Sequence, residues 1–242
     1  VNQDLKNLFH NAPWGILVAT GLAALLFNVV RDRVAIYFFR DYVKVNYRME
    51  GTGWDMTTIY FLVGQAANLI GVMAAPSVSA KYGKKRTYMI AILIAGALST
   101  GFYFIPNSVT WILVFQFLIS VFAGYVLPLL WSMFADIVDH QELITGRRAT
   151  GLIFSSSSMS QKLGWALGSA LSGWILALFN YMPDAMEQSS QTIFGEHIMI
   201  SLMPAVCCLL AFMGMLFYPL SDKKVKEISA ELELKRNNIK PE

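Results

Sequence analysis

The chain has 242 residues, of which 55% are hydrophobic and only 14% are charged, and its mean hydropathy is +0.49. A soluble globular domain does not need this much apolar surface. The net charge of +3 is too small to indicate a nucleic-acid partner, and the adjacent Cys207 and Cys208 fit neither a disulfide framework nor a zinc site. We therefore interpret the chain as an all-α membrane protein.

Six apolar segments are each long enough to cross a hydrocarbon core of about 30 Å as an α-helix. They comprise residues 13–39, 53–78, 88–105, 109–134, 150–179 and 194–219. Most Lys and Arg residues lie in the N-terminal lead-in, in the second and fourth connections and in the C-terminal tail, all on one predicted side of the membrane. The positive-inside rule therefore predicts cytoplasmic termini, with a six-helix bundle over residues 1–219 and a charged tail over 220–242.

The first segment carries a polar cluster of Asn28, Arg31 and Asp32. Arg31 lies about 17 residues past the helix start, or roughly 26 Å, which predicts a position near the outer interface. A long side chain can snorkel to water from there. The cluster is then either a satisfied interfacial group or the lining of a cavity that opens outward, with Asn28 one turn deeper.

Local signals predict where several helices begin, bend and pack. Thr52 and Asp55 have the spacing of a capping box, which favours Asp55 as a helix-start group over a cation ligand. Pro128 and Pro204 lie inside apolar segments and predict kinks, because proline removes one backbone hydrogen bond. Gly164 and Gly168 form a GxxxG pattern, which lets a neighbouring helix approach closely.

A charged connector of about fifteen residues separates the fourth and fifth segments. Such a dense group of charges between two apolar runs is typical of the place where a polytopic chain leaves and re-enters the bilayer. Its charged residues are Asp136, Asp139, Glu142, Arg147 and Arg148.

The fifth segment carries a lysine, Lys162, about twelve residues from its start, or roughly 18 Å into the membrane. A lysine at that depth costs about 2.5–3.5 kcal/mol and indicates a functional group. One 120° arc of this helix contains Ser155, Ser158, Gln161, Lys162 and Trp165. Hydroxyls, an amide, a cation and an indole suit a sugar-binding cavity. The alternative is a lysine that is paired for structure inside a helix bundle.

Three stretches resemble the glycoside-pentoside-hexuronide:cation symporters of the major facilitator superfamily. They are FNVVRDRVAIYFFRDYV (27–43), ADIVDHQE (135–142) and TGRRATGLIFSSSSMSQKLGWALGSALSGW (145–174). The resemblance implies a twelve-helix transporter that alternates access to a central sugar site and is driven by Na⁺, H⁺ or Li⁺. This chain would be its C-terminal six-helix half-bundle.

The same resemblance implies roles for individual residues. Lys162 matches a lysine near the cation and sugar sites, and Ser157 with Ser158 matches a cavity-facing pair. Leu127 replaces a sugar-facing tryptophan of the melibiose carriers, so melibiose specificity is not implied. Asp136, Asp139, Glu142 and Arg148 match connector charges that lock the two halves together on the cytoplasmic side. The cation-binding carboxylates of the family belong to the N-terminal six helices.

The sequence therefore predicts the C-terminal half of an inner-membrane carrier that moves a glycoside or other sugar with Na⁺ or H⁺. Its partner is an N-terminal six-helix half or a second copy of the chain. One alternative is a free-standing homodimeric carrier or channel, in which two Lys162 side chains would favour anionic solutes. A membrane-embedded enzyme or scaffold is less favoured, because no nucleophile, base and orienting group stand at a workable spacing and a scaffold does not explain Lys162.

Overall fold

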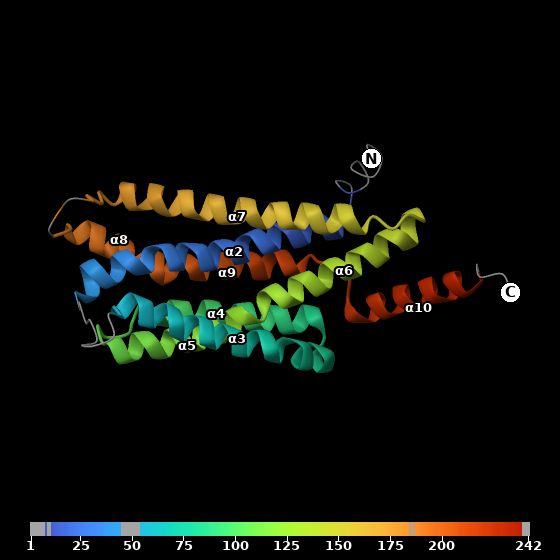
Figure 1. The fold of residues 1–242 in the computed structure, drawn as a ribbon, viewed down its shortest axis with the longest axis horizontal. Coiled ribbons are helices and arrows are strands. Elements are labelled where there is room, and N and C mark those ends of the chain that lie inside the picture. The colour runs from blue at the N-terminus through green and yellow to red at the C-terminus, as the bar shows by residue number, and fades with distance from the viewer. Residues whose placement is uncertain (1–7, 9–10, 45–53, 184, 186, 239–242) are drawn as a thin grey trace.

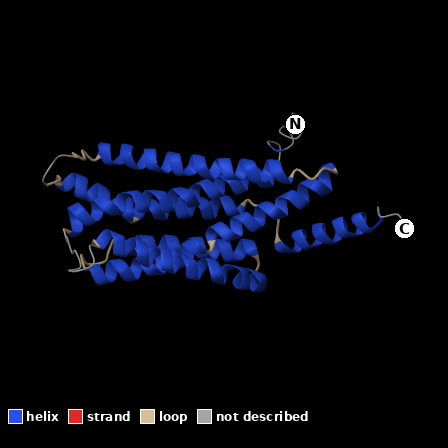
Figure 2. Ribbon diagram, in the orientation of Figure 1, coloured by secondary structure: helices blue, strands red, loops and turns tan. Residues whose placement is uncertain are grey.

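The structure is a computed structural model that describes residues 8, 11–44, 54–183, 185 and 187–238. Within these residues the chain is helical and contains no strand (Figure 2). The predictions that concern residues 1–7, Thr52, Gly53 and 239–242 lie outside the described part.

The helices follow one another with short connections (Figure 1). In chain order they are α2 (Ala12–Phe38), the π-helix η1 (Phe39–Val43), α3 (Met56–Tyr82), α4 (Lys84–Phe102), α5 (Val109–Gly124), α6 (Val126–Thr145), α7 (Thr150–Leu178), α8 (Ser190–Ile200), α9 (Leu202–Leu216) and α10 (Asp222–Asn238).

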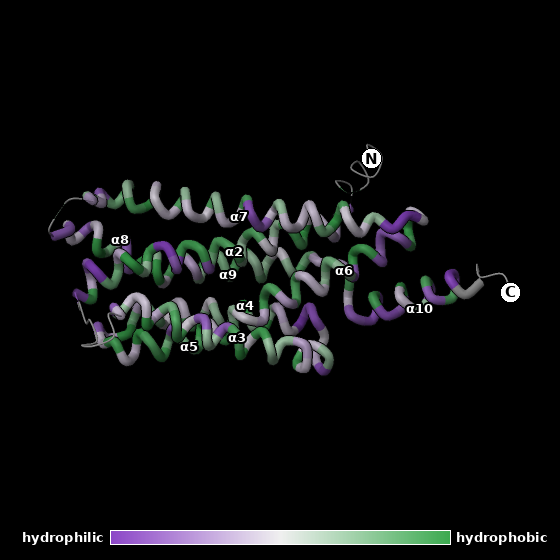
Figure 3. The backbone as a smooth tube through the Cα atoms, in the orientation of Figure 1, coloured by the Kyte–Doolittle hydropathy of each residue, from purple (hydrophilic) through white to green (hydrophobic). Residues whose placement is uncertain are grey.

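The helices pack in two groups. Helix α2 contacts α7, α8 and α9, while α3 contacts α5, and α4 joins the groups by contacting both α5 and α9. Helix α6 runs obliquely between the groups and extends beyond them towards α10 (Figure 1). We call the end that holds the start of α2, the end of α6 and α10 the α10 end, and the opposite end the η1 end. Polar residues gather at both ends, and apolar residues dominate between them (Figure 3).

The prediction of a charged connector of about fifteen residues is largely wrong, because helix α6 continues to Thr145. Asp136, Asp139 and Glu142 therefore lie on the last turns of a helix, and only residues 146–149 connect it to α7. Apolar residues on that helix continue at a helical spacing, and they bury one face while the acids take the other. The buried residues are Met133, Phe134, Ile137, Val138 and Gln141. Gly146 ends the helix with φ 67°, a left-handed conformation that glycine adopts without strain.

The predicted kinks at Pro128 and Pro204 are confirmed as breaks between helices. The residues between the paired helices are Tyr125 and Ser201, each three positions before a proline. The proline nitrogen cannot donate to the carbonyl four residues earlier, so the helix turns there. The predicted fourth and last segments are therefore the pairs α5 and α6, and α8 and α9.

The second connection is shorter than the predicted gap between residues 78 and 88. Helix α3 begins after Asp55, whose carboxylate accepts a hydrogen bond from the Thr58 backbone N–H at 2.7 Å, which confirms its helix-start role. The helix runs to Tyr82, and α4 starts at Lys84. Gly83 alone separates them with φ 89°, a value that other residues rarely adopt.

Glycines allow the closest helix contacts. A side chain at Gly168 of α7 would press against Val29 of α2, at 2.8 Å from its Cγ1 atom, which confirms the close approach that the GxxxG pattern predicts. The sequence analysis missed a second such contact, in which Gly71 of α3 lies directly against Gly124 of α5. The contact between α2 and α7 fixes the spacing of two helices that carry candidate site residues.

Four segments are long and apolar enough to cross a membrane. They are Ala12–Val43, Met56–Tyr82, Val109–Thr145 and Ser190–Leu216. Helix α4 falls short because its first turn is basic, and α7 because its serines and Lys162 lower its hydropathy. An all-α architecture with membrane-spanning helices is thus supported, and the count of six spans stays a prediction.

Candidate functional site

Helix α7 presents Lys162 on an exposed face. Ser155 is exposed on the same face, and the Trp165 indole is 51% exposed. In the described part of the chain, Lys162 makes neither a hydrogen bond nor an ion pair. The opposite face of α7 is buried against α2 and α6, so the exposure of Lys162 follows from its position around the helix.

The other predicted residues of α7 face different surroundings. The Ser157 hydroxyl is buried and donates to the Ile153 carbonyl at 2.7 Å, and the Ser158 hydroxyl donates to the Phe154 carbonyl at 2.9 Å. Ser157 and Gln161 line a crevice of about 10 Å³ between α2, α6 and α7. That volume is at the lower limit for one water molecule, so the crevice holds no sugar. The predicted set is therefore split between an exposed face and a closed crevice.

Helices α2 and α7 run in the same direction, which sets the depth of each polar group. Gly164 lies opposite Leu22 and Leu25 of α2, and further along, the Arg33 Nε atom donates to the Ser169 hydroxyl at 3.2 Å. Ser169 is seven residues beyond Lys162, or about 10 Å along the helix. The α2 cluster thus lies nearer the η1 end than Lys162 does, and the structure does not bring the two together.

Arg31 is placed wrongly by the sequence analysis, both as an interfacial group and as the lining of an outward cavity. Its side chain is only 3% exposed and donates to the Gln116 side-chain carbonyl of α5. Its guanidinium carbon lies 5.8 Å from the Phe27 ring centroid. Arg31 belongs to the buried face of α2 with Phe27 and Val34, so the helical face decides its surroundings.

The neighbours of Arg31 behave differently. Asp32 is exposed on the next position around α2, and the Asn28 amide is half-buried and donates to the Ala24 carbonyl at 3.1 Å. The predicted cluster is therefore three residues in three environments. Asp32 keeps an ionisable group at the surface of α2.

Acidic residues of α6 form ion pairs at the α10 end. Both Asp136 oxygens accept from the Lys84 ammonium at 2.7 Å. The Lys84 backbone N–H donates to Asp222 at 2.8 Å, which ties the start of α10 to the start of α4. The sequence analysis placed Lys84 among the basic residues of the second connection and did not pair it with Asp136. The opposite charge of Asp136 on the same predicted side was the available clue.

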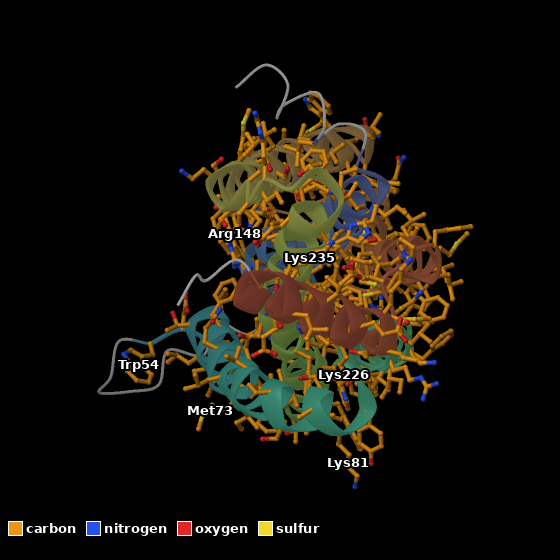
Figure 4. The ribbon with its side chains drawn as sticks, turned by 90° about the vertical axis from the view of Figure 1, so that its right-hand side faces the viewer. Trp54, Met73, Lys81, Arg148, Lys226 and Lys235 are labelled. Carbon is orange, nitrogen blue, oxygen red and sulfur yellow. The ribbon has the colours of Figure 1, made fainter. Side chains whose placement is uncertain are left out.

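Glu142 accepts from two arginines at once. Its carboxylate lies 3.0 Å from Arg148 and 2.7 Å from Arg236 of α10. Arg148 also lies 3.4 Å from Asp139. The hydrogen bond to Glu142 raises the pKa of the Arg236 guanidinium, whose side chain is 52% exposed. Figure 4 looks onto this end and labels Arg148 beside α6 and Lys226 and Lys235 on α10.

Arg147 is exposed next to this group, and its backbone N–H donates to the Thr145 hydroxyl at 3.3 Å. A cavity of about 830 Å³ opens between the end of α3, the start of α4, the first half of α6 and helix α10. Its charged lining comprises Lys81, Lys84, Arg86, Asp136, Asp222, Lys223 and Lys226. The α10 end is therefore a cross-linked charged surface with a basic hollow.

Apolar helices with polar ends, packed through glycines and broken at prolines, define an all-α integral membrane protein. The chain belongs to the MFS/sugar transport protein family, whose model matches residues 1–222. This result confirms the family that the sequence resemblance indicated. It is a family of membrane transporters, so the prediction that the chain is not an enzyme is also confirmed.

Individual relatives carry transporter names. The chain is 31% identical over 238 residues to a glucuronide carrier protein homolog of Escherichia coli (strain K12), covering 96% of the chain and 50% of the relative. It is 31% identical over 238 residues to the isoprimeverose transporter of Lactiplantibacillus pentosus, covering 97% and 47%. It is 29% identical to an inner membrane symporter of E. coli (strain K12), covering 96% and 49%. The chain spans about half the length of these relatives.

Proposed function

We propose that the chain is the C-terminal half of a secondary transporter that carries a sugar or glycoside, coupled to Na⁺ or H⁺, by alternating access. The observation that carries this proposal is the exposed cation of Lys162 on α7, in a chain that aligns with half of each related carrier. In such folds the substrate and ion sites lie near the membrane midplane, between two halves that rock against each other.

Lys162 needs a partner that the described helices do not supply. It is the thirteenth residue of α7, about 18 Å from the helix start, which is too deep for its ammonium to reach either interface easily. Insertion of such a charge costs about 2.5–3.5 kcal/mol unless it faces a polar cavity or an opposite charge. A carboxylate from the other half of the carrier would supply that charge.

The exposed face around Lys162 suits a sugar. Trp165 offers a flat apolar ring face for a pyranose, and Ser155 and Ser158 offer hydroxyl groups for hydrogen bonds. In this proposal Asp32 of α2 lies on the route from the η1 end to Lys162. Ser157 and Gln161 shape the wall behind the face through the crevice with α2 and α6, while Arg31 ties α2 to α5.

Exposed apolar side chains on α3 and α7 support the need for further helices or lipid around this half. On α7 they include Leu163, Leu167, Trp174 and Leu178, and on α3 they include Leu62, Leu69, Ile70 and Met73. We propose that part of this surface contacts an N-terminal six-helix half, and that the α10 end with both termini faces the cytoplasm of an inner-membrane carrier, as its basic residues favour.

Uptake of labelled glycosides into proteoliposomes tests the proposal. We expect the complete carrier to accumulate a glycoside when a Na⁺ or H⁺ gradient is applied, and this chain alone to accumulate none. Gradient-driven uptake by the chain alone would contradict the half-carrier and favour the homodimer. Absence of uptake by a well-folded complete carrier across a panel of glycosides would contradict sugar transport.

The ion pairs at the α10 end suggest a cytoplasmic gate made of Asp139, Glu142, Arg147 and Arg148, together with Asp136. We expect Arg148→Ala to weaken this gate by about 1 kcal/mol, because exposed ion pairs are weak and Arg236 still holds Glu142. Cysteine probes at the cytoplasmic entrance should then react about fivefold faster in the complete carrier. Lys235→Ala, which breaks only the Lys235–Glu231 pair within α10, is the matched control. Equal probe reactivity in both variants would remove Arg148 from the gate.

A further inference from the structure

A buried acid lies at the η1 end, far from the Lys162 face. Glu196 of α8 is 0% exposed, and neither of its carboxylate oxygens has a hydrogen-bond donor in the described part of the chain. An ionised carboxylate without donors is very unfavourable in such a place. The side chain therefore needs either a proton or a ligand.

The group next to Glu196 is a second acid. Asp41 of η1 lies within interaction range of the Glu196 carboxyl, and its side chain is only 10% exposed. Arg40 binds both oxygens of Asp41, at 2.7 and 2.8 Å, and also donates to the Tyr181 hydroxyl at 2.8 Å. The one guanidinium thus compensates the Asp41 charge and leaves Glu196 without a cation of its own.

Two carboxylates in contact repel each other strongly, and such pairs share one proton. We propose that Asp41 and Glu196 form a proton-binding site at the η1 end, which holds one proton between η1 and α8. This site is independent of the proposed sugar site. Arg40 on Asp41 disfavours a metal ion there, and the described residues contain no group of three His, Cys, Asp or Glu that could hold one.

The other groups around the pair do not supply a competing charge. His197 follows Glu196 on α8, but its ring is stacked between Tyr42 of η1 and Tyr103 after α4, with centroid distances of 4.9 and 4.8 Å. Tyr37 of α2 and Tyr181 after α7 lie at this end, and their rings contact each other. The other titratable groups on the helices packed against α8 are Arg31, Asp32 and Arg33 of α2, Lys162 of α7, and Cys207 and Cys208 of α9.

The proton has a structural consequence because it joins two elements. With the proton, the pair can form a hydrogen bond between η1 and α8. Without it, two negative charges face each other across that contact, beside the break between α8 and α9 at Ser201. Proton release therefore loosens the contact between η1 and α8.

Infrared spectroscopy of the complete carrier tests the site without any transport assay. At neutral pH we expect a carbonyl stretching band of a protonated carboxyl, which Glu196→Gln removes. The matched control is Glu187→Gln at the same end, because Glu187 is 83% exposed and pairs only loosely with Lys44, at 3.4 Å. It should leave the band unchanged.

Thermal unfolding gives a second measure. The folded pair holds a proton that the unfolded chain releases above about pH 4–5. Wild-type stability therefore falls as the pH rises from that value to the pKa of the folded pair, and the unfolding constant increases by about tenfold per pH unit. Glu196→Gln should remove this pH dependence. If Glu196→Gln does not fold, Asp41→Asn is the variant to measure in its place. A protonated-carboxyl band that both Glu196→Gln and Glu187→Gln leave intact would overturn the proposal. Release of the proton on addition of Na⁺ would also overturn it, because the site would then bind a metal cation.

Discussion

Replacing Lys162 with alanine should reduce gradient-driven glycoside uptake by the complete carrier about 10- to 150-fold. The range follows from the loss of one hydrogen bond to a charged group, worth about 1.5–3 kcal/mol. The loss should appear in transport and not in folding, because Lys162 is exposed on α7 and no described residue pairs with it. Initial uptake rates in proteoliposomes with equal amounts of carrier measure the effect.

The control for this variant is Lys235→Ala, which also removes one lysine charge but from the exposed surface of α10. It should keep uptake within a factor of two, since a surface ion pair contributes about 0–1 kcal/mol. Lys162→Arg keeps the charge but changes its shape, so an intermediate rate would indicate that the geometry of the ammonium matters. If Lys162→Ala transports as well as wild type, the proposed site is wrong.

Replacement of Trp165 tests sugar binding separately from cation coupling, although both are proposed for the same face of α7. Trp165→Ala should raise the glycoside concentration for half-maximal uptake about fivefold or more, because a stacked aromatic face contributes about 1 kcal/mol. Its exposed position predicts little change in stability. A variant with unchanged concentration dependence would show that the sugar does not stack on this ring.

The parts of the fold that depend on local sequence could be predicted. Pro128 and Pro204 break helices because each lacks the N–H that would donate to the carbonyl one turn earlier. Asp55 caps α3 by a hydrogen bond to a residue three positions further on. Gly164 and Gly168 predict close packing because small residues one turn apart leave room for any neighbour.

The incorrect predictions concern helix ends and side-chain burial that depend on packing between helices. The acids from Asp136 to Glu142 were read as a loop because they are charged, although apolar residues at helical spacing continue between them. Arg31 was placed by its depth along α2, and its burial depends on which face meets α5. Glu196 was missed because its partner Asp41 lies far away in the chain, and only the packing of α8 on η1 brings them together.

Replacing Gln116 with leucine should destabilise the half-bundle by about 2–4 kcal/mol, which is the largest stability effect we expect from a single substitution. Gln116 of α5 accepts from the buried guanidinium of Arg31 and donates to the Tyr60 carbonyl of α3 at 3.3 Å. Leucine has a similar size but can do neither. A buried cation would then lack an acceptor, which costs more than the hydrogen bond itself contributes.

A double-mutant cycle separates this mechanism from a simple packing defect. Arg31→Met removes the cation, so Gln116→Leu combined with Arg31→Met should recover most of the lost stability, whereas two independent packing defects would add. Gln116→Glu offers a second comparison, because a carboxylate still accepts from Arg31 but cannot donate to the Tyr60 carbonyl, so the loss should be smaller than that of Gln116→Leu. Denaturant unfolding of the complete carrier in detergent measures each variant. Additive losses in the cycle would show that Arg31 does not depend on Gln116, and that the polar link between α2, α3 and α5 is incidental to the fold.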